Sequence, residues 1–237
     1  MPLHHSLRRV RRSVAVRALI PIVLASTFSS APQVIGVATA HCPGDTGRWQ
    51  VSAQQALPAA GSAAKGVIPY VSLVTCNEPV NHSVELIRDV GWVQVGWTHT
   101  GGGPVHAYCE AQNRYDSTIH LLLEYSMSLS SHLYEYSYST ADTNWNCRLD
   151  GNVLAVIDYS VTEFGTGGDV SSQGEAFGKH GQIGVNAPGA MLVSGLRWRR
   201  ASNAVWSDMT LTRNAPPAPY GNAVPEAGKY QMWTNAH

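Results

Sequence analysis

The sequence lacks the features that mark several common classes of protein. It has no apolar run of about 20 residues that could cross a membrane as a helix. It contains no C-x-x-C pair and no H-E-x-x-H motif, so the usual spacings of zinc ligands are missing. No G-x-S-x-G segment is present, which argues against the nucleophile turn of the α/β-hydrolases. We therefore expect no cofactor, no metal and no membrane span.

The first forty residues have the pattern of a secretory signal peptide. They contain five arginines and no acidic residue, followed by the short apolar run 18–25. The segment Ala38-Thr39-Ala40 then offers an A-x-A cleavage site before His41. We expect residues 1–40 to be removed on export and the remaining chain to be extracellular, with no membrane association after cleavage.

Charge is scarce in this sequence, because only 14% of the residues are Asp, Glu, Lys or Arg. The full chain has 16 basic and 16 acidic residues, and without 1–40 it keeps 11 basic residues against 16 acidic, a net charge of −5. A net negative chain is a poor partner for nucleic acid. The remaining 197 residues suit one domain, which we expect to be a monomer.

Cysteine is also rare, and all four cysteines lie beyond the expected signal peptide. An even number in an exported protein favours two disulfides, for which three pairings are possible. We favour Cys42–Cys76 with Cys109–Cys147, because each pair closes a loop of moderate length.

Helical patterns are absent after residue 66, and short β-prone runs broken by turn residues replace them. Residues 41–66, rich in Ala, Gly, Ser and Gln, are expected to form a loosely structured leader, with one helical turn around Ser52–Leu57. Residues 67–237 are expected to form the folded domain. Its strands are predicted at 67–75, 92–98, 105–112, 118–126, 132–139, 152–162, 170–177, 191–199 and 229–233. The pattern predicts an all-β fold, a two-sheet antiparallel β-sandwich of concanavalin-like or jelly-roll type.

Strand alternation sorts the polar residues of this predicted sandwich by face. In 92–98, Val93, Val95 and Trp97 form a core face, whereas Trp92, Gln94 and Gly96 point the other way. In 171–177 the residues that share a face are Ser171, Gln173, Glu175 and Phe177. In 105–112 they are His106, Tyr108, Glu110 and Gln112.

The order of these short motifs resembles the eqolisin-type glutamic peptidases. W-V-Q-V-G-W at 92–97 is followed by a glycine-rich turn, then by Tyr108-Cys109-Glu110, and finally by G-E-A at 174–176. The neprosin-like prolyl peptidases share the sandwich but use two glutamates. The resemblance implies a secreted hydrolase that cleaves polypeptide at acid pH, with Gln94 and Glu175 as the catalytic pair. Trp92, Tyr108 and Glu110 would bind the substrate. In the family a tryptophan usually follows the glutamate, whereas this chain has Ala176 and Phe177.

Two other functions fit the same residues. A glycosidase needs two carboxylates about 5–10 Å apart, and the candidates are Glu110, Glu124, Glu135 and Glu175. A non-catalytic extracellular protein that binds carbohydrate or polypeptide is the stronger alternative, because the chain has 7 Trp and 10 Tyr. Such aromatic side chains can stack on sugar rings or polypeptide. The residues alone leave a polypeptide substrate and an extracellular polysaccharide both open as partners.

Overall fold

The computed structural model describes most of the chain from Arg48 to Thr234 as strands and their connections. The described residues are 48–57, 62–71, 73, 79–88, 91–101, 103–113, 116–141, 143–158, 168–177, 182–184, 191–200 and 204–234. The strands are β1 (Arg48–Ala56), β2 (Ala63–Ile68), β3 (Pro79–Arg88), β4 (Gly91–Thr100), β5 (Val105–Asn113), β6 (Asp116–Ser126), β7 (His132–Ser139), β8 (Asn144–Leu149), β9 (Asn152–Ile157), β10 (Asp169–Phe177), β11 (Met191–Arg199), β12 (Ser207–Asp208), β13 (Thr212–Arg213), β14 (Tyr220–Ala223) and β15 (Tyr230–Thr234). None of the described residues lies in a helix long and apolar enough to span a membrane.

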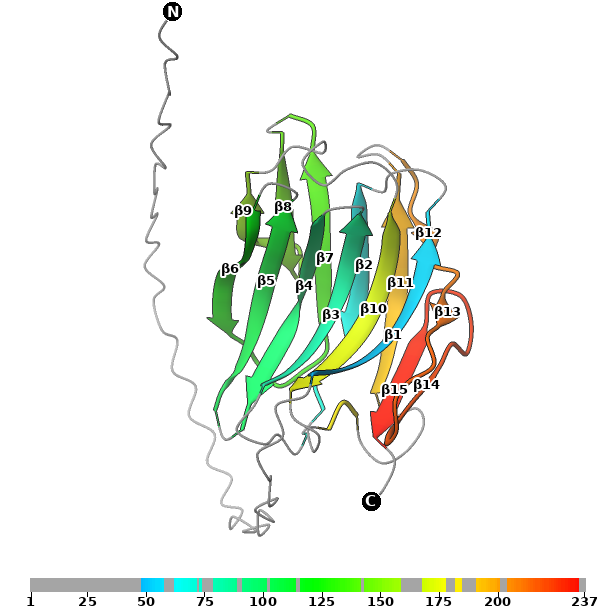
Figure 1. Ribbon diagram of the computed structural model, residues 1–237. Coiled ribbons are helices and arrows are strands. Elements are labelled where there is room, and N and C mark those ends of the chain that lie inside the picture. Colours follow the sequence, from blue (N-terminus) through cyan, green and yellow to red (C-terminus); the bar gives the residue numbers. More distant parts are fainter. Residues whose placement is uncertain are drawn as a thin grey trace, which may run out of the picture. The chain divides into compact units, whose positions relative to one another are not determined.

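The strands form two antiparallel sheets that face each other (Figure 1). The first sheet has seven strands in the order β13-β1-β10-β3-β4-β5-β6. The second has eight, in the order β14-β15-β11-β2-β7-β8-β9, with β12 beside β11. The predicted all-β sandwich is therefore confirmed.

The core lies between the two sheets and is built by strand alternation. Val93, Val95 and Trp97 of β4 are completely buried, as the period-2 pattern predicts. The facing sheet contributes Tyr134, Tyr136 and Trp145, whose rings are also fully buried. These two tyrosines therefore pack the interior, which excludes them from an aromatic binding platform.

A disulfide between Cys109 of β5 and Cys147 of β8 joins the two sheets. Both cysteines are fully buried in the core, and the predicted pairing is confirmed for them. The bond closes a loop of 38 residues, so restriction of the unfolded chain stabilises the fold by about 4 kcal/mol in the chain-entropy model. The predicted Cys42–Cys76 pair and the expected signal peptide, 1–40, lie outside the described residues.

The leader expected over residues 41–66 differs from the structure wherever these residues are described. The helical turn expected at Ser52–Leu57 is wrong, because β1 pairs with β10 through Ala56. β2 begins at Ala63 and pairs with β7 and β11. The small residues that suggested a loose segment fit the tight space between the sheets, where Ala53 and Ala64 are fully buried.

The remaining strand predictions hold for most of the domain. β7 and β11 have the expected bounds. Asp150-Gly151 forms the turn between β8 and β9, with both residues at positive φ. The prediction missed β3, β8 and the short strands β12, β13 and β14, and of the strand expected over 67–75 only the first two residues belong to a strand, β2, among those described. β3 matters most for the site, because it lies between β10 and β4 in the middle of the seven-stranded sheet.

Candidate active site

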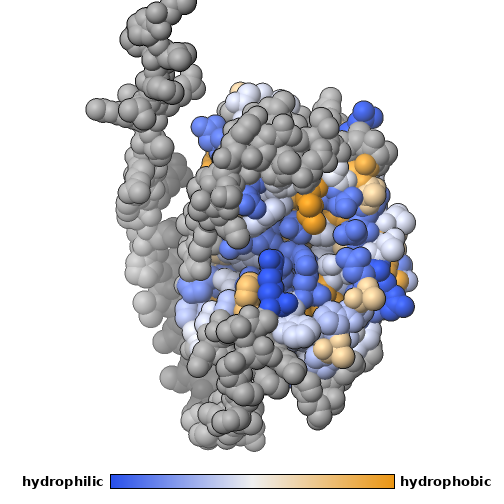
Figure 2. Space-filling model, viewed as in Figure 1, coloured by the Kyte–Doolittle hydropathy of each residue, from blue (hydrophilic) through white to orange (hydrophobic). Residues whose placement is uncertain are grey.

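The outer face of the seven-stranded sheet is polar, because strand alternation sends the apolar residues of the same strands into the core. Cross-strand partners share a face, so the register defines three neighbouring rows over β10, β3, β4 and β5. The rows are Ser171–Glu85–Gln94–Glu110, Gln173–Ser83–Gly96–Tyr108 and Glu175–Asn81–Thr98–His106. Figure 2 shows hydrophilic residues gathered over the middle of this face.

The polar side chains at the centre of this face are closely packed and shielded from water. Gln94, Gln173 and Glu175 are each 3% exposed or less. A cleft of about 450 Å³ opens beside them. The residues that line this cleft are Arg48, Asn81, Glu85, Ile87, Trp92, Gln94, Glu110, Gln112, Glu175 and Phe177. Both predicted catalytic side chains therefore line one cleft, together with two of the predicted substrate-binding residues.

The Gln94 amide is held by three side chains. Its Oε1 accepts hydrogen bonds from Ser83 Oγ (3.1 Å) and Gln173 Nε2 (2.9 Å). Its Nε2 donates to Glu110 Oε2 at 2.6 Å. These bonds fix the orientation of the amide, because the carbonyl and amino ends of the group each have a distinct partner. Glu110 is thus the carboxylate in direct contact with Gln94.

Glu175 lies further along the same face. Its carboxylate forms an ion pair with Arg48, whose side chain is 58% exposed. Gln94 is in register with Ser171, four residues before Glu175, so the two backbones are about 13 Å apart along the strand direction. Gln173 occupies the space between them: it donates to Gln94 and accepts a hydrogen bond from Gln50.

Glu85 is a buried carboxyl group in this cluster, only 8% exposed. Burial is the main cause that raises its pKa to about 7, and the charges of Glu175 and Glu110 raise it further. A hydrogen bond from Ser171 Oγ (3.0 Å) and the charge of Arg48 act in the opposite direction. Glu85 therefore carries a proton at acidic pH.

This proton makes the stability of the fold depend on pH. The pKa of Glu85 is about 7 in the folded protein and about 4.5 in the unfolded chain. Protonation of Glu85 therefore adds to the free energy of unfolding, and this contribution is fully present below pH 4.5. It is lost as pH rises through 7, which lowers the free energy of unfolding by about 3 kcal/mol. Urea unfolding at pH 4.5 and pH 8 should show this decrease. The Glu85→Gln variant, which can still accept from Ser171, should show a much smaller one. An equal decrease in both proteins would contradict the assignment.

The three predicted substrate-binding residues occupy different depths of the face. Trp92 is half-buried at the cleft, and its Nε1 donates to Gln112 Oε1 (3.0 Å). Tyr108 is only 1% exposed. Burial raises its pKa well above the usual value, and the charges of Glu110 and Glu175 add to this. Tyr108 lines a second cavity of about 350 Å³, which shares Asn81, Glu110 and Phe177 with the first.

Among the described residues, no three His, Cys, Asp or Glu side chains form a set that could hold a metal ion. The glutamates considered for a glycosidase also divide between sheets, since Glu135 is on β7 of the eight-stranded sheet and Glu110 and Glu175 are on the other.

Sequence reasoning missed several residues of the cluster. Glu85 and Ser83 were missed because β3 was not predicted. Gln173 could have been found from the sequence, because alternation already placed it on the face of Glu175. No sequence pattern pointed to Arg48, since its partner Glu175 is 127 residues away in the sequence.

Comparison with known proteins gives a likeness of fold. No protein-family profile and no curated protein matches the sequence. Among solved structures, scytalido-glutamic peptidase with a peptide-based transition-state analogue is similar at a TM-score of 0.56 and 10% identity, covering 78% of this chain and 98% of that one. SCP-B, a member of the eqolisin family of peptidases in complex with the tripeptide Ala-Ile-His, has a TM-score of 0.54, 10% identity and the same coverage. The chain therefore shares the β-sandwich fold of these peptidases.

Proposed function

We propose that this protein is an exported hydrolase that cleaves polypeptide at acidic pH, with Gln94 and Glu175 as its catalytic pair. The observation that carries the proposal is the fixed Gln94 amide, which lies in a cleft with three glutamates: Glu85, Glu110 and Glu175. A peptide bond needs a hydrogen-bond donor for its developing oxyanion and a carboxyl group for proton transfer. This cleft contains both kinds of group.

The hydrolysis steps follow from the chemistry of these side chains. Glu175 takes a proton from water, the hydroxide attacks the carbonyl carbon, and the amide nitrogen receives the proton as the C–N bond breaks. Gln94 Nε2 has a second N–H besides the one donated to Glu110, and this N–H stabilises the oxyanion. Gln173 lies in the space between the pair and bonds to Gln94, so a peptide bond that contacts both groups has to displace the Gln173 side chain.

Other features of the protein also support catalysis at acidic pH outside the cell. The pKa of Glu85 near 7 leaves this group neutral at acidic pH, so the cluster carries less mutual repulsion there. The disulfide between Cys109 and Cys147 is typical of an oxidising, extracellular environment. The fold shared with glutamic peptidases adds to the same interpretation.

A non-catalytic polypeptide-binding or carbohydrate-binding role is the second candidate, and one observation favours it. The polar groups of the cluster bond to one another: Glu175 pairs with Arg48, and Gln94 pairs with Ser83, Gln173 and Glu110. A network satisfied in this way can form a rigid recognition surface without turnover.

The test is an assay of the purified protein on a reduced and alkylated protein substrate between pH 2.5 and pH 7.5, with products identified by mass spectrometry. We expect internal cleavage that is fastest below pH 5. Binding of the unfolded substrate without peptide products at any pH would reject the hydrolase and leave the binding role. Cleavage that a metal chelator or a serine-directed phosphonate abolishes would indicate a contaminating enzyme.

A further inference from the structure

The side chain of Gln173 fills the space between Gln94 and Glu175 and is only 2% exposed. Its carboxamide forms a hydrogen bond at each end: Nε2 donates to Gln94 Oε1 at 2.9 Å, and Oε1 accepts from Gln50 Nε2. A substrate that reaches both members of the catalytic pair has to take this place. Gln50 and Gln94 then lose their partner, unless the substrate itself bonds to them.

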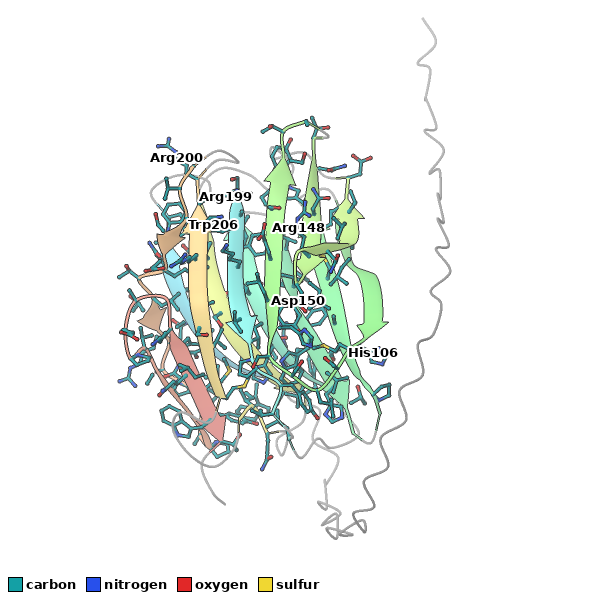
Figure 3. All side chains as sticks on the ribbon, turned by 180° about the vertical axis from the view of Figure 1, so that it is seen from behind. His106, Arg148, Asp150, Arg199, Arg200 and Trp206 are labelled. Atoms are coloured by element: carbon teal, nitrogen blue, oxygen red, sulfur yellow. A yellow bond between two sulfur atoms is a disulfide. The ribbon has the colours of Figure 1, made fainter. Side chains whose placement is uncertain are left out.

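Gln50 brings an amide donor to the site from β1, the strand next to β10. It is the cross-strand partner of Glu175, and the row that contains both residues runs to His106 of β5, which is labelled in Figure 3. The next residue of β1, Val51, is fully buried in the core, so alternation places Gln50 on the outer face. Gln50 is itself exposed, and its amide can therefore reach a chain that lies on this face.

The carboxamide of Gln173 presents the same groups as a peptide bond. A primary amide is planar, with one C=O and with one N–H that points away from it, as in a trans peptide group. Gln94 Oε1 accepts from the nitrogen and Gln50 Nε2 donates to the oxygen. Both hydrogen bonds could therefore pass from Gln173 to a peptide group of a substrate. A sugar hydroxyl, which donates and accepts at one oxygen atom, does not offer this pair of groups.

We propose that Gln173 occupies the place of a substrate peptide group, and that Gln50 Nε2 and Gln94 Oε1 bind this group once the side chain is displaced. The inference rests on the proposed function, and it makes Gln50 a further substrate-binding residue. In an extended chain the N–H and C=O of one residue point to the same side. The residue that donates its N–H to Gln94 Oε1 thus presents its own C=O to the Gln94 amide. The peptide group held by Gln50 therefore lies just before the scissile one.

The proposal is tested by titration calorimetry of the full-length protein with acetyl-hexaalanine amide, which offers backbone groups and no functional side chain. The titration is done at pH 7.5, where the proposed cleavage is slow, and mass spectrometry checks that the probe stays intact. Gln173→Ala should bind the probe about fivefold more tightly or better, because the side chain that competes for the same partners is gone. Gln173→Ser should behave in the same way and serves as a second, polar variant.

The contribution of Gln50 is measured in the variant that lacks Gln173, because in the unaltered protein Gln50 also holds Gln173 in place. The double variant Q50A/Q173A should bind the probe about fivefold more weakly than Q173A, the usual effect of one neutral hydrogen bond. An acetyl-hexalactate amide keeps each C=O and replaces each backbone N–H by oxygen. It should bind Q173A more weakly than the alanine probe, because Gln94 Oε1 then receives no donor.

Gln231→Ala is the matched control, since it removes an amide from β15 of the other sheet and should leave the affinity unchanged. Circular dichroism should show that all variants are folded. Equal affinities of Q173A and the unaltered protein, or of Q173A and Q50A/Q173A, would overturn the inference even if the protein cleaves polypeptide. Tighter binding by Q173A in a protein that cleaves at no pH would support the peptide site and reject only the hydrolase.

The kinetics of an active protein give a second test. If Gln173 competes with the substrate, Gln173→Ala should lower KM for a peptide substrate. If Gln173 only orients Gln94, the same substitution should lower kcat and leave KM unchanged, and that result would overturn the inference.

Discussion

Gln94→Ala should lower the rate of polypeptide cleavage at acid pH by at least a hundredfold. The substitution removes the N–H proposed to stabilise the oxyanion, and loss of one such donor costs about 10²–10³ in rate. It also leaves Ser83, Gln173 and Glu110 without their shared partner. The measurement is kcat and KM on one peptide from the substrate digest. We expect the loss in kcat, since the amide acts in the transition state.

Two glutamate variants then separate the roles of the carboxylates. Glu175→Gln should abolish cleavage, because an amide cannot exchange the proton that the reaction requires. Glu110→Gln should reduce the rate by less than about tenfold, because its carbonyl oxygen can still accept the hydrogen bond from Gln94 Nε2. The difference between these variants identifies the carboxyl group that transfers the proton.

Gln231→Ala is the matched control for these variants, because it removes an amide from β15 in the other sheet and should leave the rate unchanged. Full activity in both Gln94→Ala and Glu175→Gln would reject the catalytic pair. A complete loss in Glu110→Gln with activity kept in Glu175→Gln would assign proton transfer to Glu110, the direct partner of Gln94.

Gly96→Ala should destabilise the fold by about 3 kcal/mol or more, a loss in the range of the most damaging single substitutions. A Cβ at this position would lie 1.7 Å from the carbonyl oxygen of His82 and 2.8 Å from the Cα of Ser83. Both atoms belong to the backbone of β3, so they can move only if the β3–β4 pairing opens. Urea unfolding would measure the change in free energy.

Gly103→Ala is the comparison for this variant, because its nearest atom would be Thr100 O at 3.2 Å. We expect it to change the free energy of unfolding by less than about 1 kcal/mol. Equal stability of Gly96→Ala and the unaltered protein would contradict the close approach of β3. The space beside the Cα of Gly96 is therefore occupied by the neighbouring strand, β3.

The sequence predicted the face on which each side chain of the candidate site lies better than it predicted which residues make up the site. Period-2 alternation placed Gln94 and Trp92 on one face of β4, and Gln173 and Glu175 on one face of β10. Alternation works here because the pleat alone decides the face of each residue. It needs no knowledge of which strands are neighbours.

β3 escaped prediction because a buried histidine interrupts its apolar pattern. Its core-facing residues are Val80, His82, Val84 and Leu86. His82 packs on Trp97, with 4.5 Å between ring centroids. Burial lowers its pKa to about 3, so it stays neutral and behaves as a core residue above that pH. A run of Asn, His and Ser reads as a turn until the tertiary environment is known.

The sequence by itself determined that this is an all-β chain with an amide and a carboxylate on outward faces of two strands, because alternation and turn residues act locally. Only the tertiary structure decided which groups meet. It placed Gln173 between Gln94 and Glu175, brought Arg48 to Glu175, and buried Glu85 among other carboxyls. These contacts join β1, β3, β4 and β10, and their order in the sheet depends on packing between residues far apart in the sequence.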